Sequence, residues 1–283
     1  RGMRRDTNML MMQYVHERML ELVRKSYPED YERYRHFYIR FEFKEKKSSY
    51  SKYIFEKRIL QITTLSREPA DILLSLILEL AHHIDIIRRK ETHDDRTYLL
   101  IVRKLLDTAL KQNMILPSEL YRTGIRGLKD RLQENFGSFQ SWRCEPRQES
   151  EHVYILVFDA YMIKNLLKAN SYRYDPDQQA WSKYIKAEEY DDELYFLSQY
   201  QNRADFRIIK DNTFYIRPCY CLKIETYSIE DKELWKAFSY HYRPTEKKWY
   251  KYIYAADLRI ELEMIQDLPK QKITISRIKA ARA

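Results

Sequence analysis

The sequence predicts an α+β protein, with a helix-and-sheet domain followed by two smaller repeated units. Three observations support this fold class. Apolar residues recur at helical spacing in long segments of the first half, such as 7–25 and 69–89. Segments in which apolar and polar residues alternate lie between those helices. In the second half, the segment 171–194 aligns without a gap to the segment 239–262.

The first domain is expected to span residues 1–135. Its expected elements are, in order, a helix over 7–25, strands at 36–43, 49–56 and 57–65, a helix that starts within Ser66 to Pro69 and runs to about Arg89, a helix over about 96–111 and a helix from about Ser118. The second helix has Ser66 as its candidate N-cap and Pro69 in its first turn, where proline is well tolerated. Residues 136–152 are polar and irregular, so we expect an interdomain linker there.

The repeat carries identical residues at one offset of 68. The matching pairs are Leu166 and Leu234, Lys168 and Lys236, Ala169 and Ala237, Tyr172 and Tyr240, Tyr174 and Tyr242, Pro176 and Pro244, Trp181 and Trp249, Lys183 and Lys251, Tyr184 and Tyr252, and Ile185 and Ile253. Each unit is predicted to run strand, helix, hairpin, helix, with proline presetting the hairpin turn. The units are expected at 153–203 and 219–270, with a connecting hairpin at 204–218 and a basic tail at 271–283.

Charge and composition favour some classes of protein and disfavour others. The formal net charge is +9, and residues 1–150 hold 29 Lys and Arg against 22 Asp and Glu. Such a surplus attracts nucleic acid or an acidic protein, although a solvated surface of mixed charge is an equally ordinary interpretation. The three cysteines form no disulfide framework, which fits a reducing, cytoplasmic setting. No apolar run is long enough to cross a bilayer, so we expect no membrane partner.

The helix over 69–89 contains an altered zinc-peptidase motif. In His-Glu-x-x-His, two histidines four residues apart share one helical face and bind Zn²⁺, while the glutamate acts as a base. Here the first histidine position is Leu78, followed by Glu79 and His82, and His93 lies eleven residues further on. The segment 51–110, with "LELAHH" and "THDDRTY", resembles the SprT-like family of zinc metallopeptidases. This resemblance implies a zincin-like domain over about 10–112.

Three hypotheses follow from this motif. In the first, the chain is a pseudo-metallopeptidase, because two histidines alone hold Zn²⁺ poorly; catalytic residues and cofactors are then absent and Glu79 is vestigial. In the second, Glu79, His82 and His93 form a rearranged zinc site in a weak metallopeptidase, with His83 as a spare ligand. In the third, the helix is an ordinary core element and its histidines are incidental.

The repeated units combine aromatic and basic residues. Their Tyr-x-Tyr-x-Pro…Trp pattern resembles the core of the HARP domain found in DNA-annealing helicases. Trp181 and Trp249 are expected to pack each hairpin on its helix, while other rings stack on bases and nearby cations contact phosphates. The residues predicted to bind nucleic acid or a partner are Arg173, Lys183, Arg243, Lys247, Lys248, Tyr250, Lys251 and Tyr252. The same residue types also anchor protein interfaces.

The resulting expectation is a non-catalytic binding protein of a bacterial or phage-related mobile element. It would engage nucleic acid or a nucleoprotein complex, for example as an anti-CRISPR-like inhibitor of a host defence nuclease. The alternatives are the zinc-dependent metallopeptidase with a rearranged site and a protein–protein adaptor that binds no nucleic acid.

Overall fold

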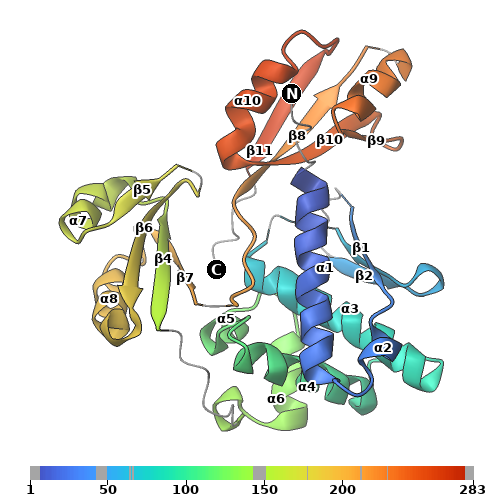
Figure 1. The fold of residues 1–283 in the computed structure, drawn as a ribbon, viewed down its shortest axis with the longest axis vertical. Helices are drawn as coiled ribbons and strands as arrows, with labels where there is room; N and C mark the ends of the chain where they lie inside the picture. The colour runs from blue at the N-terminus through green and yellow to red at the C-terminus, as the bar shows by residue number, and fades with distance from the viewer. Residues whose placement is uncertain are drawn as a thin grey trace.

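The computed structural model confirms a mixed α+β protein. It describes residues 7–42, 50–63, 65, 67–142, 151–176, 178–210, 212–227 and 229–277. The candidate N-cap Ser66 and residues 143–150 of the expected linker lie outside these ranges. Three sheets are present among the described residues, one of three strands and two of four strands (Figure 1).

The N-terminal unit, residues 7–142, follows the predicted order of helices and strands. Its elements are α1 (Thr7–Ser26), α2 (Tyr31–Tyr34), β1 (Tyr38–Phe41), β2 (Ser51–Ile54), η1 (Phe55–Lys57), β3 (Ile59–Ile62), α3 (Pro69–Arg89), α4 (Arg96–Lys111), α5 (Pro117–Tyr121), α6 (Leu128–Phe136) and η2 (Phe139–Ser141). The strand order is β1-β3-β2, with β1 parallel and β2 antiparallel to β3. Helix α3 packs on one face of this sheet, and α4 packs on α3.

The ends of α3 and α4 have local physical causes. Pro69 lies in the first turn of α3, and Lys90 ends that helix in the left-handed conformation with its N–H bonded to the Ile86 carbonyl. Asp95 caps α4, because its carboxylate accepts a hydrogen bond from the Tyr98 N–H at 3.0 Å.

The single helix expected from Ser118 is instead two short helices, α5 and α6. Gly127 precedes α6 at φ +73°, a conformation that interrupts a helix. The Gly124 N–H donates to the Asp71 carboxylate in the first turn of α3, so the segment between α5 and α6 is held against that helix. The start of the expected linker also belongs to this unit, since Phe139 and Trp142 are buried in its core.

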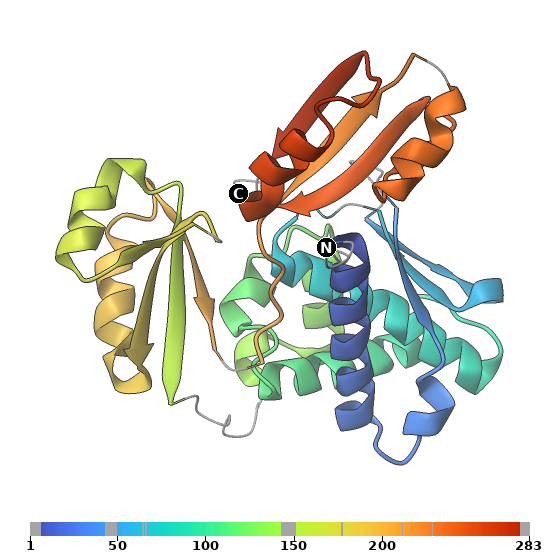
Figure 2. The same ribbon diagram turned by 45° about the horizontal axis from the view of Figure 1, so that its top comes forward.

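The two four-stranded sheets have the same strand order and antiparallel pairing. The first unit, residues 152–209, has β4 (His152–Phe158), η3 (Tyr161–Ile163), α7 (Lys164–Ala169), β5 (Arg173–Asp175), β6 (Ala180–Lys186), η4 (Ala187–Glu189), α8 (Tyr190–Ser198) and β7 (Asp205–Ile209), with order β5-β6-β4-β7. The second unit, residues 219–277, has β8 (Cys219–Glu225), η5 (Ile229–Asp231), α9 (Lys232–Ala237), β9 (His241–Arg243), β10 (Lys248–Tyr254), η6 (Ala255–Asp257), α10 (Leu258–Met264) and β11 (Lys272–Arg277), with order β9-β10-β8-β11. Each sheet carries its two helices on one face (Figures 1 and 2).

Two boundary expectations were wrong. The segment 204–218 does not form a separate hairpin: β7 pairs with β4, and no strand occurs among the described residues 212–218. The segment 271–283 is not simply a tail, since β11 pairs with β8, while residues 278–283 lie outside the described ranges. In each unit the first strand, β4 or β8, has one edge that the hairpin does not pair. The fourth strand, β7 or β11, forms hydrogen bonds with that edge, and tertiary contacts decide which edge such a strand joins.

The two sheets differ in what covers the face away from their helices. In the second unit that face carries Cys219, Cys221, Tyr250 and Tyr252, which are buried in the same core as the helices of the N-terminal unit. Helix α1 contacts β10 directly. The first unit has a separate core made by its own strands and helices.

Candidate functional site

The altered zinc motif lies on α3 beneath strand β2. Glu79 is 9% exposed, and its Oε1 accepts a hydrogen bond from the Ser51 hydroxyl at 2.7 Å. Burial raises the pKa of Glu79 to about 6, against the lowering effect of hydrogen bonds from Ser51 and the Tyr53 backbone. The carboxylate is therefore held by the sheet.

His82 is occupied by different neighbours. Its Nδ1 lies 2.7 Å from the Thr92 hydroxyl, and its ring stacks on Tyr98 with centroids 4.2 Å apart. Its Nε2 lies 3.7 Å from Asp94. Burial lowers the pKa of His82, although Asp94 opposes this effect.

The remaining predicted metal ligands do not complete a site. His93 is 65% exposed and lies 3.4 Å from Glu91. His83 is fully buried, with Tyr53 on its Nδ1 at 2.8 Å and the Tyr34 carbonyl on its Nε2 at 3.0 Å. Within the described ranges, no group of three His, Cys, Asp or Glu side chains could hold a metal ion. Glu79, His82 and His93 therefore do not fit zinc, and His83 is a structural residue rather than a spare ligand.

Two lysines predicted to contact phosphates are used inside the fold instead. Lys183 forms an ion pair with Glu193, and Lys251 forms an ion pair with Glu261 at 2.8 Å. Lys251 also donates to the Phe238 carbonyl at 3.0 Å. Both lysines are engaged inside the fold, because each points to the helix side of its sheet and meets a glutamate ten residues later.

These pairs form part of a cluster that recurs in both units. Tyr172 donates its hydroxyl to Glu193 at 2.7 Å, and the Lys183 ammonium lies 5.5 Å from the Tyr172 ring centroid. In the second unit Lys251 lies 5.3 Å from the Tyr240 ring, and burial together with Glu261 raises the pKa of Tyr240. We call each set a Tyr-Lys-Glu cluster; it was missed because the matching glutamates were not considered with the lysines.

The two tyrosines predicted to contact nucleic acid or a partner are also buried. Tyr250 is 5% exposed and hydrogen-bonded to Glu246, and Tyr252 is 1% exposed. Strand alternation places both on one face of β10, and that face packs against the N-terminal unit. Trp181 and Trp249 pack in the cores of their units as expected, against Tyr174 and Tyr242 respectively.

The other predicted contact residues are not brought together. Arg243 pairs with Glu246 at 2.6 Å, and Lys248 pairs with Glu225 at 2.8 Å. Lys247 and Arg173 are exposed, but they belong to different units. Within the described part of the chain, the predicted contact residues of the second unit therefore do not form one basic, aromatic surface.

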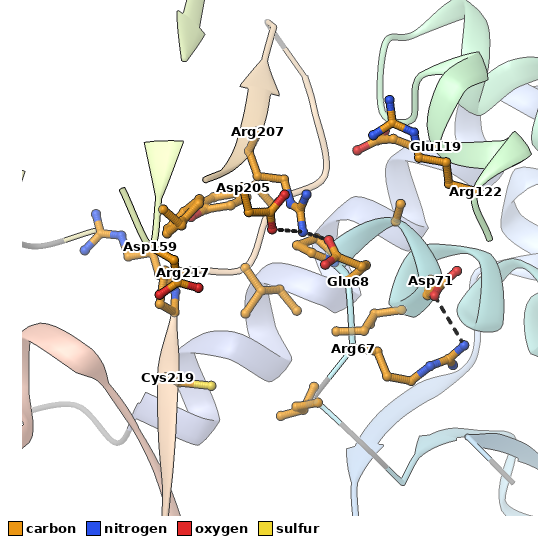
Figure 3. A pocket seen from close by; sticks show the side chains of 18 of the residues that line it. Arg67, Glu68, Asp71, Glu119, Arg122, Asp159, Asp205, Arg207, Arg217 and Cys219 are labelled. Carbon is orange, nitrogen blue, oxygen red and sulfur yellow. Dashed lines mark ion pairs between the residues drawn. The ribbon is translucent and has the colours of Figure 1, made fainter. Parts of the chain in front are cut away.

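A cleft of about 760 Å³ lies where the three units meet (Figure 3). Arg207 of β7 forms an ion pair with Glu68, directly before α3, and lies 3.7 Å from Asp205. Arg67 lies 3.7 Å from Asp71. The lining contains as many acidic as basic side chains: Arg67, Arg122, Arg203, Arg207 and Arg217 against Glu68, Asp71, Glu119, Asp159 and Asp205. Its charges therefore balance, and the cleft is an ion-paired junction between units.

The cleft also lacks an activated nucleophile among its described residues. Cys219 lines it, but burial raises the pKa of this thiol to about 12, so it stays protonated near neutral pH. Sequence reasoning missed the cleft because six separate segments of the chain build it.

None of the described helices has the length and apolar character needed to cross a membrane. Comparisons with protein-family models, curated proteins and solved structures gave no match to the chain.

Proposed function

We propose that this chain is a non-catalytic binding protein that engages nucleic acid or a nucleoprotein complex. The proposal that the chain is non-catalytic is supported by one observation: the three candidate zinc donors each contact a different neighbour and do not converge on one point. Glu79 is bound by Ser51, His82 by Thr92, and His93 lies in solvent beside Glu91. The binding part is supported by the positive surplus of residues 1–150, which favours an anionic partner.

The proposal includes an origin for the scaffold. We infer that the N-terminal unit is a SprT-like domain without its metal, and that the two sheet units are copies of one HARP-like module. Equal strand order supports duplication, as does the left-handed backbone of Ser171 and Ser239 and of Gln179 and Lys247, which match at offset 68. A host defence nuclease carrying nucleic acid is the specific target class that this origin suggests.

Nucleic-acid binding is tested by a mobility shift of the whole chain with short single- and double-stranded oligonucleotides. We expect binding at low salt that weakens steeply as salt rises, because neutralised phosphates release counterions. Absence of any shift at low salt would reject nucleic acid as the ligand and leave the adaptor function. Affinity purification from the native host would then identify the protein partner.

The scaffold origin makes a separate prediction about zinc. Leu78 and His82 are one helical turn apart, and Asp94 lies 3.7 Å from His82 Nε2, so Leu78→His would add the missing donor next to two others. We expect L78H to bind Zn²⁺ about 100-fold more tightly than the natural chain, measured by competition with a chromogenic chelator. Adding H82A to L78H should abolish the gain. A folded L78H protein with unchanged zinc affinity would contradict the proposed origin.

A further inference from the structure

The three-stranded sheet of the N-terminal unit has one covered face and one open face. Ser51 and Tyr53 of β2 point to α3, where they contact Glu79 and His83. Because side chains alternate along a strand, the neighbours of these residues point the other way. This face carries Tyr38, Arg40, Lys52, Ile54, Ile59 and Gln61, which the strand register places in two rows. Gln61 at its centre is 6% exposed, and Glu42 follows Arg40 on the same side and accepts a hydrogen bond from Gln61.

The first row presents an aromatic ring beside aliphatic side chains. Tyr38 is paired with Ile59, which is paired with Ile54 on the other side. Tyr38 is 68% exposed, although it lies in a regular strand, and the two isoleucines are partly exposed. Exposed aromatic rings on a flat sheet are suited to stacking on bases.

The second row presents two cations on either side of an amide. Arg40 and Lys52 are exposed at the two edges of the sheet, with Gln61 between them. The Gln61 side chain accepts a hydrogen bond from Arg40 Nε at 3.1 Å and donates to Glu42 at 2.6 Å. The guanidinium of Arg40 is thus oriented by Gln61 through its Nε and one Nη, and the residue as a whole is exposed.

Positive charge exceeds negative charge on and beside this face. Its described charged residues are Arg40, Lys52, Lys57 and Arg58 against Glu42 and Glu56, a surplus of two. Among the described residues, Lys57 and Arg58 are exposed where β2 leads into β3, and Phe55 beside them is 53% exposed. The face therefore joins exposed rings to positive charge, which favours an anionic ligand with aromatic groups.

A comparable ring in the first unit lacks this charge. Tyr184 is 65% exposed on β6 and stacks on His152 with centroids 4.9 Å apart. Its neighbour Lys186 lies 3.8 Å from Glu188, and residues 151–283 as a whole carry 22 Lys and Arg against 20 Asp and Glu. Tyr184 therefore serves as a matched control for Tyr38: its ring is equally exposed, but it lies in a part of the chain with little net positive charge.

We propose that the open face of the β1-β3-β2 sheet binds a single strand of DNA. Tyr38 stacks on a base, while Arg40 and Lys52 contact phosphates on either side of it. A duplex does not fit this role, because its bases are already stacked on one another and its edges alone are accessible. Stacking and phosphate contacts do not require the ribose 2′-hydroxyl that distinguishes RNA from DNA. Single-stranded DNA is therefore the simplest ligand that can make both kinds of contact with this face. This inference rests on the proposed nucleic-acid function and gives it a location.

The test is fluorescence anisotropy of the whole chain with a labelled oligothymidylate of about 15 nucleotides. Tyr38→Ala should weaken binding about 5- to 100-fold through the loss of one stacking contact, whereas Tyr38→Phe should keep the affinity within about twofold. The double variant R40A/K52A should flatten the dependence of log affinity on log salt by about 1.4, the value for two phosphate contacts on a single strand. Y184A and R259A, which alter an equally exposed ring and an exposed arginine of α10, should behave as the natural chain.

The outcomes separate the two proposals. If the natural chain fails to bind any oligonucleotide at low salt, the nucleic-acid function fails together with this inference. If it binds while Y38A and R40A/K52A match Y184A and R259A, the site is elsewhere and only this inference fails. Binding of duplex DNA or of RNA alone, with no binding of oligothymidylate, would also overturn it. All variants change exposed side chains, and unchanged circular dichroism spectra would confirm that each is folded.

Discussion

Replacing Lys251 with methionine is expected to lower the free energy of unfolding by about 3–5 kcal/mol, because it leaves a buried carboxylate without its charge partner. The side chains of Lys251 and Glu261 are only 10% and 9% exposed, and their atoms lie 2.8 Å apart. Water cannot replace the ammonium group there, and the Phe238 carbonyl also loses its donor. Urea denaturation followed by circular dichroism would measure the loss.

Two further variants distinguish a lost ion pair from a general packing defect. Lys183→Met alters the equivalent lysine of the first unit, whose side chain is 23% exposed. Glu193 keeps the hydrogen bond from the Tyr172 hydroxyl at 2.7 Å, so the loss should be limited to about 1–2 kcal/mol. The double variant K251M/E261L removes both charges and should recover most of the stability lost in K251M. A double variant as unstable as K251M would show that the charge pair is not the cause.

Acidification is expected to destabilise the chain through His83, and the variant H83Q should remove this effect. Burial lowers the pKa of His83 from 6.5 to about 4, with Arg58 and His36 adding to the shift and the Tyr34 carbonyl opposing it. A lowered folded-state pKa means that the stability is complete above pH 6.5 and is lost as the pH falls toward 4. Between pH 7 and pH 4.5 this loss amounts to about 2–3 kcal/mol.

Glu79 works in the opposite direction over the same range. Its folded-state pKa of about 6 exceeds the ordinary value of 4.5, so its contribution is complete below pH 4.5 and is lost as the pH rises through 6. Acidification therefore recovers about 1–2 kcal/mol at Glu79 and partly masks the loss at His83. Urea unfolding at pH 7 and pH 4.5 should thus show a smaller loss, or a gain, in H83Q than in the natural chain. The control H93Q changes a 65% exposed side chain and should not alter the pH dependence; identical slopes in H83Q and the natural chain would contradict the prediction.

The local sequence was sufficient to predict most helices and strands. Pro69 and the apolar spacing after it predicted the helix α3 with a start within Ser66 to Pro69 and an end near Arg89, and the observed helix runs from Pro69 to Arg89. The break between α5 and α6 was missed because it depends on the bond from Gly124 to Asp71, which lies far away in the chain. The partners of β7 and β11 were missed for a similar reason, since strand propensity does not specify which edge a strand joins.

Site prediction failed where it depended on what covers a surface. Tyr250 and Tyr252 were predicted to contact a ligand, and no local pattern indicates that another unit buries them. The lysine assignments could have been avoided, because Glu193 and Glu261 are themselves identical at offset 68 and recur with Lys183 and Lys251. A charge pair that repeats together in an internal duplication is better interpreted as part of the fold than as a ligand contact.

The unequal cores of the two sheet units have a thermodynamic consequence. The second sheet contributes Tyr250 and Tyr252 to the main core, so this unit and the N-terminal helices should melt in one cooperative transition. The first unit has an independent core and is joined to the remainder by contacts such as the Arg207–Glu68 pair. On heating, the first unit should therefore unfold in a separate transition, visible in calorimetry as an extra peak. Two units of the same fold in one chain would then differ in whether they can unfold independently of the N-terminal unit.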